Sequence, residues 1–514
     1  MSSDISPNNK RIAKNALLLY GRMFLMLSIS LYTSRVILKT LGIEDYGIYN
    51  VVGGVISMFA FITAALSSST QRYITYYLGK GNLNELKEVF GMSLLIHFLI
   101  ALLIFILGET IGLWFVLEKL VIPNGRMNSA IWVYQLSIIA SLINIISIPY
   151  NAEIIAHEKM GVFAYISVLE AVLKLVIVYL LVIIPYDKLK VYALLVMIIA
   201  LLIRYIYGRY CRKHFTEAHF IIPNNKNLFK EMVSFAGWNL WGGLSAVISG
   251  QGLNILLNMF FGPAVNAARG ISVQVQSAIL QFATNFQTAL NPQITKTYAA
   301  NKLNEMHNLI FRSSKFTFIL LFLICYPIML ETDKILSLWL EEVPDYTAIF
   351  VKLMLCITLL DSMSNPIMNA NAATGKVKIY QLTIGSIVIL VLPISYVLLK
   401  MGCDPWVVFA VHLGICSVTF ITRLLLVSPQ IQLSLKMFFI RVIIPCLMVL
   451  IASMPISLVV MHFMEKGVLR ILLIVIICTL NISIAAYFLA LTREEQDFVK
   501  GKALEFWGKL KKNV

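Results

Sequence analysis

The stretch LLLYGRMFLMLSISLYTSRVIL, residues 17–38, is apolar apart from Arg22, Arg35 and a few hydroxyl side chains. The turn KTLGIEDYG follows at residues 39–47, and a second apolar run begins at Ile48. A helix needs about 20 apolar residues to cross a bilayer core, so the stretch predicts a membrane hairpin. Arg22 lies well inside the first helix, and an ionisable residue at that depth is a candidate functional residue. The alternative is that Arg22 reaches the interface or pairs with a neighbouring helix end.

Pieces of this early region return later in the chain in the same order. Leu83-Asn84-Glu85 returns as Leu303-Asn304-Glu305, at the same shift that joins Ile74-Thr75 to Ile294-Thr295. An ordered series of matches, whose spacing changes only between them, indicates a duplicated module. The other matches join Leu41-Gly42 to Phe261-Gly262, Leu113-Trp114 to Leu338-Trp339, and Pro149, Ala156 and Lys159 to Pro366, Ala373 and Lys376.

The composition is that of a membrane protein with many spans. Hydrophobic residues make up 59% of the 514 residues and charged residues only 13%, whereas a soluble domain carries nearer a quarter charged. The first apolar run is long and lacks the small-residue exit of a cleaved signal peptide. The seven cysteines lie mostly in apolar runs without a Cys-x-x-Cys pair, so we expect neither disulfides nor a metal site, and no cofactor.

Apolar runs bounded by charged or turn residues predict an all-α fold with about 14 transmembrane helices, in two six-helix repeats and a C-terminal pair. An even number of helices per repeat makes the repeats parallel. The predicted spans are 13–37, 47–70, 90–116, 130–152, 161–184, 191–209, 235–258, 270–292, 311–331, 347–370, 379–400, 405–427, 438–462 and 468–491. The predicted parts are an N-terminal bundle (1–210), a cytoplasmic linker (211–232), a C-terminal bundle (233–428), the extra pair (429–491) and a basic amphipathic tail (492–514).

Lysine and arginine predict the orientation, because they are enriched in cytoplasmic loops. With the N-terminus inside, 28 of the 42 fall in inner segments, 10 in outer segments and four in spans. Both termini are therefore expected in the cytoplasm. The formal net charge of +16 indicates an anionic membrane surface nearby and not nucleic acid.

Polar side chains are concentrated in the first two helices of each half. The span 270–292 carries a stripe at steps of three and four, which places it on one helix face. In lipid such a face must meet protein or water, so it lines either a cavity or a helix–helix contact. The stripe is Gln274, Ser277, Gln281, Thr284, Asn285 and Thr288, and the preceding span adds Ser249, Gln251, Asn254 and Asn258.

Two carboxylates lie in later spans. Glu170 and Lys174 are four residues apart and can neutralise one another on one helix face. Asp361 shares a face with Asn365 and Asn369 and is a candidate proton or cation site. We therefore name Asp361 and Glu170 as possible ion-coupling residues, with a structural pair as the alternative for Glu170.

The pattern Leu41-Gly42 with Asp45-Tyr46-Gly47, the Leu83-Asn84-Glu85 step and the segment 336–340 resemble the polysaccharide-exporter branch of the MOP superfamily, which contains lipid-linked oligosaccharide flippases such as O-antigen transporters. The resemblance implies alternating access through a cleft between two six-helix bundles. It also implies that Arg22 in the first helix, Asp45 at the start of the second and Arg269 at the start of the eighth contribute to substrate binding. Relatives carry more basic residues in the second-half cleft, where this chain has amides.

We therefore expect a flippase that moves a polyprenyl-diphosphate-linked oligosaccharide to the outer leaflet of the bacterial inner membrane for surface polysaccharide synthesis, such as lipopolysaccharide. Its expected partners are this substrate, membrane lipids and polysaccharide polymerase machinery. The alternative is a cation-coupled multidrug exporter of the same superfamily. A membrane enzyme is disfavoured because no long outer loop or enzyme motif is present. The expected substrate-binding residues are Arg22, Asp45, Arg269, Gln251, Asn254, Gln274, Gln281 and Asn285.

Overall fold

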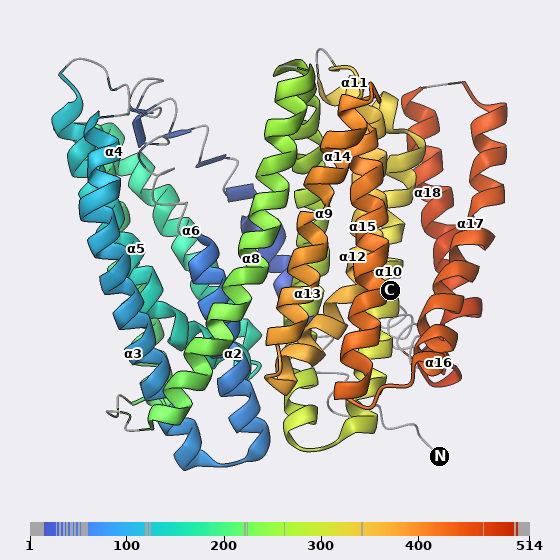
Figure 1. Cartoon of the computed structure of the whole chain (residues 1–514). Helices are drawn as coiled ribbons and strands as arrows, with labels where there is room; N and C mark the ends of the chain where they lie inside the picture. The colour runs from blue at the N-terminus through green and yellow to red at the C-terminus, as the bar shows by residue number, and fades with distance from the viewer. Residues whose placement is uncertain are drawn as a thin grey trace, which may run out of the picture. The chain divides into compact units, whose positions relative to one another are not determined.

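The structure is a computed structural model, and it describes most of the chain from Ala60 to Gln496. Among these described residues the regular elements are all helices (Figure 1). The described residues are 15–26, single residues and pairs between 28 and 52, and then 60–118, 122, 125–219, 221, 223, 225–261, 263–340, 343–465, 467–497 and 500–501.

The chain divides into two compact units. The N-terminal unit covers residues 14–244 and 295–301, and the C-terminal unit covers 245–294 and 302–514. The N-terminal unit contains α2 (Ala60–Lys80), α3 (Leu83–Leu107), η1 (Gly108–Gly112), α4 (Leu113–Glu118), α5 (Met127–Ala156), α6 (Met160–Ile183), α7 (Lys188–His214) and the beginning of α8 (Lys226–Phe261).

The C-terminal unit begins with the rest of α8 and most of α9 (Pro263–Ala299), whose last turn belongs to the N-terminal unit. Its other elements are α10 (Leu303–Leu330), α11 (Thr332–Trp339), α12 (Thr347–Thr374), α13 (Lys378–Ile389), α14 (Val391–Lys400), α15 (Val407–Val427), η2 (Ser428–Gln430), α16 (Leu435–Phe438), η3 (Phe439–Ile443), α17 (Ile444–Phe463), α18 (Val468–Ala485) and η4 (Ala486–Ala490).

Each unit is built around one proline-containing helix. In the N-terminal unit α5, with Pro149, packs against α2, α3 and α7. In the C-terminal unit α12, with Pro366, packs against α10 and α15, and these three lie side by side (Figure 1). The two prolines are matched by the sequence repeat, so equivalent positions of the repeat lie in equivalent helices.

Residues with a left-handed backbone conformation also occupy equivalent positions in the two repeats. Gly81 precedes Leu83-Asn84-Glu85 with a φ of 73°, and Asn301 precedes Leu303-Asn304-Glu305 at the matching position with a φ of 58°. Glu158 follows α5 with a φ of 58°, and Gly375, its counterpart in the repeat, caps α12 with a φ of 77°. The duplicated module is thus present in the backbone as well as in the sequence.

Gly375→Ala tests this turn. A residue with a Cβ resists the left-handed region, so the variant should lose about 1 kcal/mol of folding free energy. The measurement is the thermal unfolding midpoint of the purified protein in detergent. Gly414→Ala in α15 is the control, because a Cβ there meets nothing within 4 Å. Equal midpoints for Gly375→Ala and the wild type would contradict the expectation.

Eleven described helices are long and apolar enough to cross a membrane. They correspond to eleven of the spans predicted from residue 90 onward. The span predicted at 270–292 is also helical, as α9, but its polar stripe keeps it out of that set. Parts of the spans predicted at 13–37 and 47–70, and most of the tail 492–514, lie outside the described residues, so the count of 14 stays a prediction.

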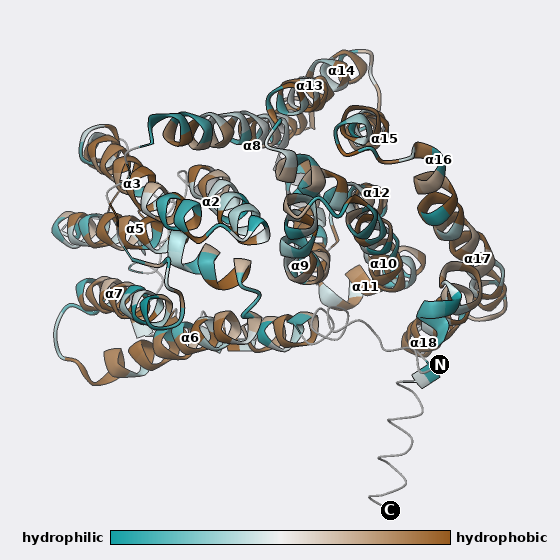
Figure 2. Ribbon diagram, turned by 90° about the horizontal axis from the view of Figure 1, so that it is seen from below, coloured by the Kyte–Doolittle hydropathy of each residue, from teal (hydrophilic) through white to brown (hydrophobic). Residues whose placement is uncertain are grey.

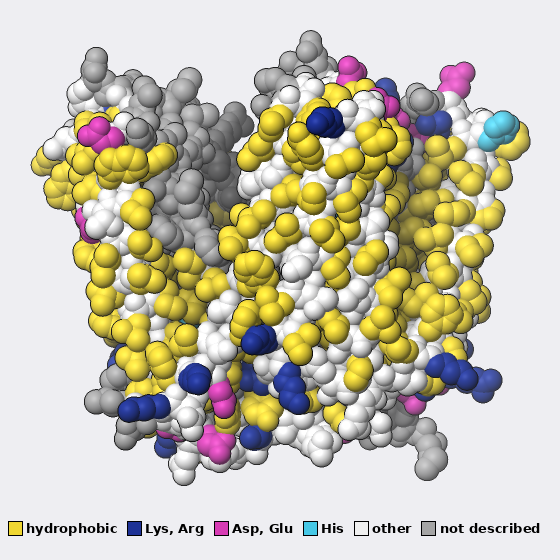
Figure 3. Space-filling view, viewed as in Figure 1, with side chains coloured by type: hydrophobic (Ala, Val, Ile, Leu, Met, Phe, Trp, Pro, Cys, Tyr) yellow, Lys and Arg dark blue, Asp and Glu magenta, His cyan; other side chains and the backbone are white. Residues whose placement is uncertain are grey.

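The surface chemistry fits a bilayer. Large apolar side chains are exposed along helices such as α3, α6, α17 and α18, for example Phe98, Val182, Ile451 and Leu472. Hydrophobic side chains cover much of the visible surface of the helices (Figure 3). By hydropathy, α17 is largely apolar, whereas α2 is mixed to polar (Figure 2). The protein is therefore a multi-pass membrane protein.

Candidate functional site

Arg22 lies on the helical segment 15–26 of the N-terminal unit. Its guanidinium carbon is 4.4 Å from the ring centroid of Phe163 on α6, which is a cation–π distance. Its Nε is buried and has no hydrogen-bond partner. Within the described residues no carboxylate lies at ion-pair distance from Arg22, which leaves donors available for an anion.

Asp45 has a different environment. Arg126, which precedes α5, forms an ion pair with Asp45, donating from Nε to Oδ1 at 2.9 Å. The same guanidinium donates from Nη1 to Oδ2 of Asp187 at 3.1 Å, and Ser129 Oγ donates to that oxygen at 2.7 Å. Asp187 also caps α7 by accepting from the backbone N–H of Leu189. Asp45 therefore has a cation partner within the protein, in a network that joins the starts of α5 and α7 and in which Asp45 and Asp187 share Arg126.

The Asp187 end of this network predicts a pH dependence. Burial would raise the pKa of Asp187, but the hydrogen bond from Ser129 and the charge of Arg126 hold it below its usual value. A depressed folded-state pKa stabilises the fold above the unfolded pKa of about 3.9, and this contribution is lost as the pH falls through the folded pKa. Asp187→Asn, which keeps a capping oxygen, should therefore lower the unfolding midpoint at pH 7, and the loss should be smaller at pH 3, below the unfolded pKa. An equal loss at both pH values would contradict the assignment.

In the C-terminal unit, Arg269 on α9 is a second cation without a carboxylate partner among the described residues. Its Nη2 donates to the carbonyl oxygen of Gly250 at 2.7 Å, and its Nε is buried without a partner. Gly250 lies on α8, next to Gln251, whose side chain is exposed. The carbonyl oxygen of Gly250 thus orients the guanidinium of Arg269, while its Nε–H stays available as a donor.

The polar stripe of α9 is exposed over much of its length. Gln274, Gln281 and Thr284 are exposed, while Asn285 is only 3% exposed and its Nδ2 has no partner. On α8, Asn254 is half-buried, and the side chain of Asn258 lies outside the described part of the structure. The stripe therefore offers three amide groups at spacings of one to two helical turns, which suits multiple hydrogen bonds to a hydroxyl-rich ligand.

The two possible ion-coupling carboxylates both have cation partners. Glu170 Oε1 accepts from Lys174 Nζ at 2.6 Å, as their spacing predicts. Asp361 Oδ1 accepts from Arg423 Nη1 at 3.1 Å, a pair that joins α12 to α15. Coupling through either residue stays a prediction, and a coupling ion would have to compete with these cations.

Several charged clusters were not expected from the sequence. Each brings together residues far apart in the chain, which local spacing does not predict; the exception is the pair Glu153 and His157, which are four residues apart. Arg126, Asp187, Glu331 and Arg470 all lie in or beside connections predicted on the same side of the membrane. The clusters are Arg126 with Asp45 and Asp187, Glu331 with Arg470, Lys315 with Glu495, and His157 with Glu153 and Glu217.

Solved structures with a similar fold define the class of protein. The chain resembles a multidrug resistance MATE family transporter of the MOP superfamily in an outward-facing conformation, with a TM-score of 0.70 and 12% identity over 83% of this chain and 96% of that one. It also resembles a MOP superfamily transporter from Pyrococcus furiosus, with a TM-score of 0.66 and 13% identity over 82% and 96%. The fold is that of MOP superfamily transporters.

The family follows from the sequence. The model of the polysaccharide biosynthesis protein family matches residues 12–290, more than half of the chain, and the MatE model matches residues 244–397. The chain therefore belongs to the polysaccharide biosynthesis protein family, which confirms the resemblance to the polysaccharide-exporter branch. No curated protein matches the chain.

Proposed function

We propose that the protein is a flippase that moves a lipid-linked oligosaccharide, carried on a polyprenyl diphosphate, from the cytoplasmic to the outer leaflet. The family match supports a role in polysaccharide biosynthesis. The observation that carries the proposal is Arg22, a cation in a predicted membrane helix with a buried Nε that has no partner. A guanidinium offers forked donors that match phosphate oxygens, so a diphosphate is the ligand chemistry that it suits.

The C-terminal unit supplies groups for the sugar. The exposed amides Gln251, Gln274 and Gln281 can donate to and accept from hydroxyls, as neutral glycans require. Arg269 adds a second cation on the same unit. The lipid tail can stay in the bilayer while the head group crosses, so the protein needs a polar path for the head group alone.

The location follows from the same proposal. A polyprenyl-linked substrate places the protein in the bacterial inner membrane, and the lysine and arginine distribution supports cytoplasmic termini. Downstream partners would be the polymerase machinery that extends exported repeat units.

The test is a deletion strain assayed for surface polysaccharide and for lipid-linked oligosaccharide inside the cell. We expect loss of surface glycan together with unpolymerised lipid-linked units on the cytoplasmic side. Normal surface glycan in the deletion strain would overturn the proposal.

A second candidate is a multidrug exporter, which is supported by the MatE match and by the MATE transporters of similar fold. An exporter of cationic drugs wants an accessible carboxylate in its binding path. Asp45, Glu170 and Asp361 are all paired with protein cations, which favours the flippase. A deletion strain with normal glycan and new sensitivity to cationic drugs would support the exporter instead.

A further inference from the structure

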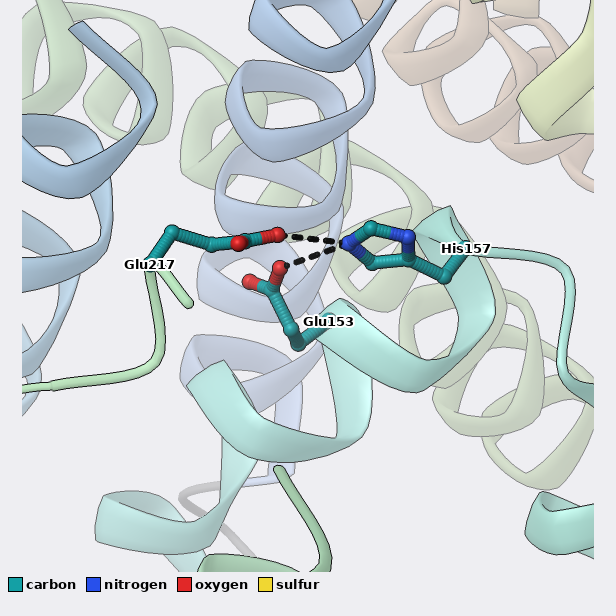
Figure 4. Close-up of side chains that lie close together, drawn as sticks. All are labelled: Glu153, His157 and Glu217. Atoms are coloured by element: carbon teal, nitrogen blue, oxygen red, sulfur yellow. Dashed lines mark hydrogen bonds and ion pairs between the residues drawn. The ribbon is translucent and has the colours of Figure 1, made fainter. Parts of the chain in front are cut away.

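Three ligating side chains of the N-terminal unit converge where α5 ends. Glu153 lies in the last turn of α5, His157 caps that helix, and Glu217 lies in the connection after α7. His157 Nε2 is 3.2 Å from Glu153 Oε1 and 2.6 Å from Glu217 Oε1. Both carboxylates point at the same ring nitrogen (Figure 4). The imidazole ring stacks on Phe215, with centroids 4.1 Å apart, which fixes its plane.

The hydrogen bonding within this cluster is incomplete. One imidazole nitrogen carries at most one proton, yet two carboxylate oxygens face Nε2. Glu153 is fully buried at 0% exposure, and its Oε2 has no hydrogen-bond partner. Glu217 is only 3% exposed, and its Oε2 accepts from Thr216 Oγ1 at 3.2 Å. Two buried carboxylates thus face a single ring nitrogen, and Glu153 Oε2 is buried without a donor, which is costly unless a further ligand satisfies it.

We propose that Glu153, His157 and Glu217 bind a divalent transition metal ion of the Zn²⁺ type. The three ligand atoms lie within 4.8 Å of one another. Imidazole nitrogen and carboxylate oxygens are ligands that Zn²⁺ takes at about 2.0–2.2 Å, which places neighbouring ligand atoms of a tetrahedral site about 3.3 Å apart. The ion would replace the proton between Nε2 and the two oxygens. The distance between His157 Nε2 and Glu217 Oε1 would then increase by less than about 1 Å.

Either of two groups can fill the fourth coordination position of the ion. Glu153 Oε2 lies on a carboxylate that already faces the cluster, so Glu153 can bind through both oxygens, or a water can complete the site. Glu217 lies in a connection and not in a helix, so it can make the small adjustment. The ion would offset the charge of both carboxylates, which a single proton does not.

The site would fasten one loop of the N-terminal unit. The next residue, Glu158, has a left-handed φ of 58° and pairs with Lys296 at 2.7 Å, while its carbonyl oxygen accepts from Asn15 Nδ2 at 3.3 Å. A metal ion on His157 would therefore hold in place the turn that carries these two contacts. The metal site would form whatever substrate the protein transports.

The test uses the full-length protein in detergent, with any affinity tag removed and metal stripped by a chelator. After incubation with Zn²⁺ and removal of excess ion, elemental analysis should find about one zinc per chain. Added Zn²⁺ should also raise the thermal unfolding midpoint, because a ligand that binds only the folded state stabilises it. Glu217→Gln and Glu153→Gln should each lose at least tenfold in zinc affinity, while His219→Ala, an exposed histidine two residues from Glu217, should not.

The outcomes separate a metal site from a hydrogen-bonded cluster. If the wild type retains no zinc and shows no shift, the three side chains form a proton-sharing cluster only and the proposal is overturned. It is equally overturned if both glutamine variants, eluting as folded monodisperse protein, keep the wild-type zinc content. The unfolding midpoints of metal-stripped Glu217→Gln and metal-stripped wild-type protein are also compared. Equal midpoints show that the substitution leaves folding intact, so that a lower zinc content reflects zinc binding alone.

Discussion

Arg22→Ala should abolish export of the surface glycan in cells that make the protein at the wild-type level. The substitution removes the guanidinium over Phe163, and no other described cation forms an equivalent contact with that ring. A diphosphate leaving water for the membrane interior needs charge-assisted donors to offset its desolvation. We expect surface polysaccharide to fall at least tenfold, with lipid-linked units accumulating inside. Arg22→Lys keeps the charge but not the fork and should retain partial export.

The matched control is Arg209→Ala, because Arg209 is an exposed arginine on α7 of the same unit. That variant should export normally. Unchanged surface glycan in Arg22→Ala, at equal protein level in the membrane, would remove Arg22 from the transport path. A fall in protein level would instead place Arg22 among the residues that support folding, and purified-protein stability would show it.

The fold could be predicted from the sequence because its signals are local. Hydrophobic runs of bilayer length and an ordered internal repeat need no knowledge of distant contacts. The pair Glu170–Lys174 was predictable for the same reason, since i,i+4 spacing places both on one helix face. The polar stripe of α9 also follows from periodicity, and its exposed face agrees with that pattern.

The ion pairs could not be predicted because their partners are distant in the chain. Asp45 had no visible partner in its turn, yet Arg126, far along the chain, takes up its charge. Asp361 had only asparagines on its own face, yet Arg423 reaches it from α15. In each case the tertiary packing of two helices decides which charges meet. Intramembrane charge is therefore a functional signal where, as at Arg22, the described residues supply no carboxylate partner.

Among the described residues, the most buried pair of an arginine or lysine with a carboxylate joins α10 to the C-terminal helix pair. Glu331 follows α10 and Arg470 lies in the first turn of α18, and their side chains are 2% and 6% exposed. Arg470 Nε is 2.7 Å from Glu331 Oε1, and Nη2 donates to Oε2 at 2.9 Å. Nη1 donates to the carbonyl oxygen of Met464, in the connection between α17 and α18. One guanidinium thus ties that connection to α10.

Arg470→Leu should destabilise the protein by about 3–5 kcal/mol, because it leaves the Glu331 carboxylate buried without its cation. The readouts are the thermal unfolding midpoint in detergent and the rate of proteolysis between α17 and α18. The double variant Arg470→Leu/Glu331→Leu should recover much of the loss, since a well-packed apolar pair replaces a buried ion pair at little cost. The pair Lys302–Glu305, whose side chains are each 59% exposed, is the control, and Lys302→Leu should change stability by less than about 1 kcal/mol.

A double variant that does not regain stability would also identify the contact that holds the connection between α17 and α18. If the double variant is as unstable as Arg470→Leu, the donation from Nη1 to Met464, and not the carboxylate, holds the connection. If Arg470→Leu itself unfolds like the wild type, the helix pair is held elsewhere. The alternative contacts are then Lys315 Nζ with Glu495 at 2.8 Å, about 24 Å along α10 from Glu331, and the hydroxyl contact of Tyr326 with Ser457.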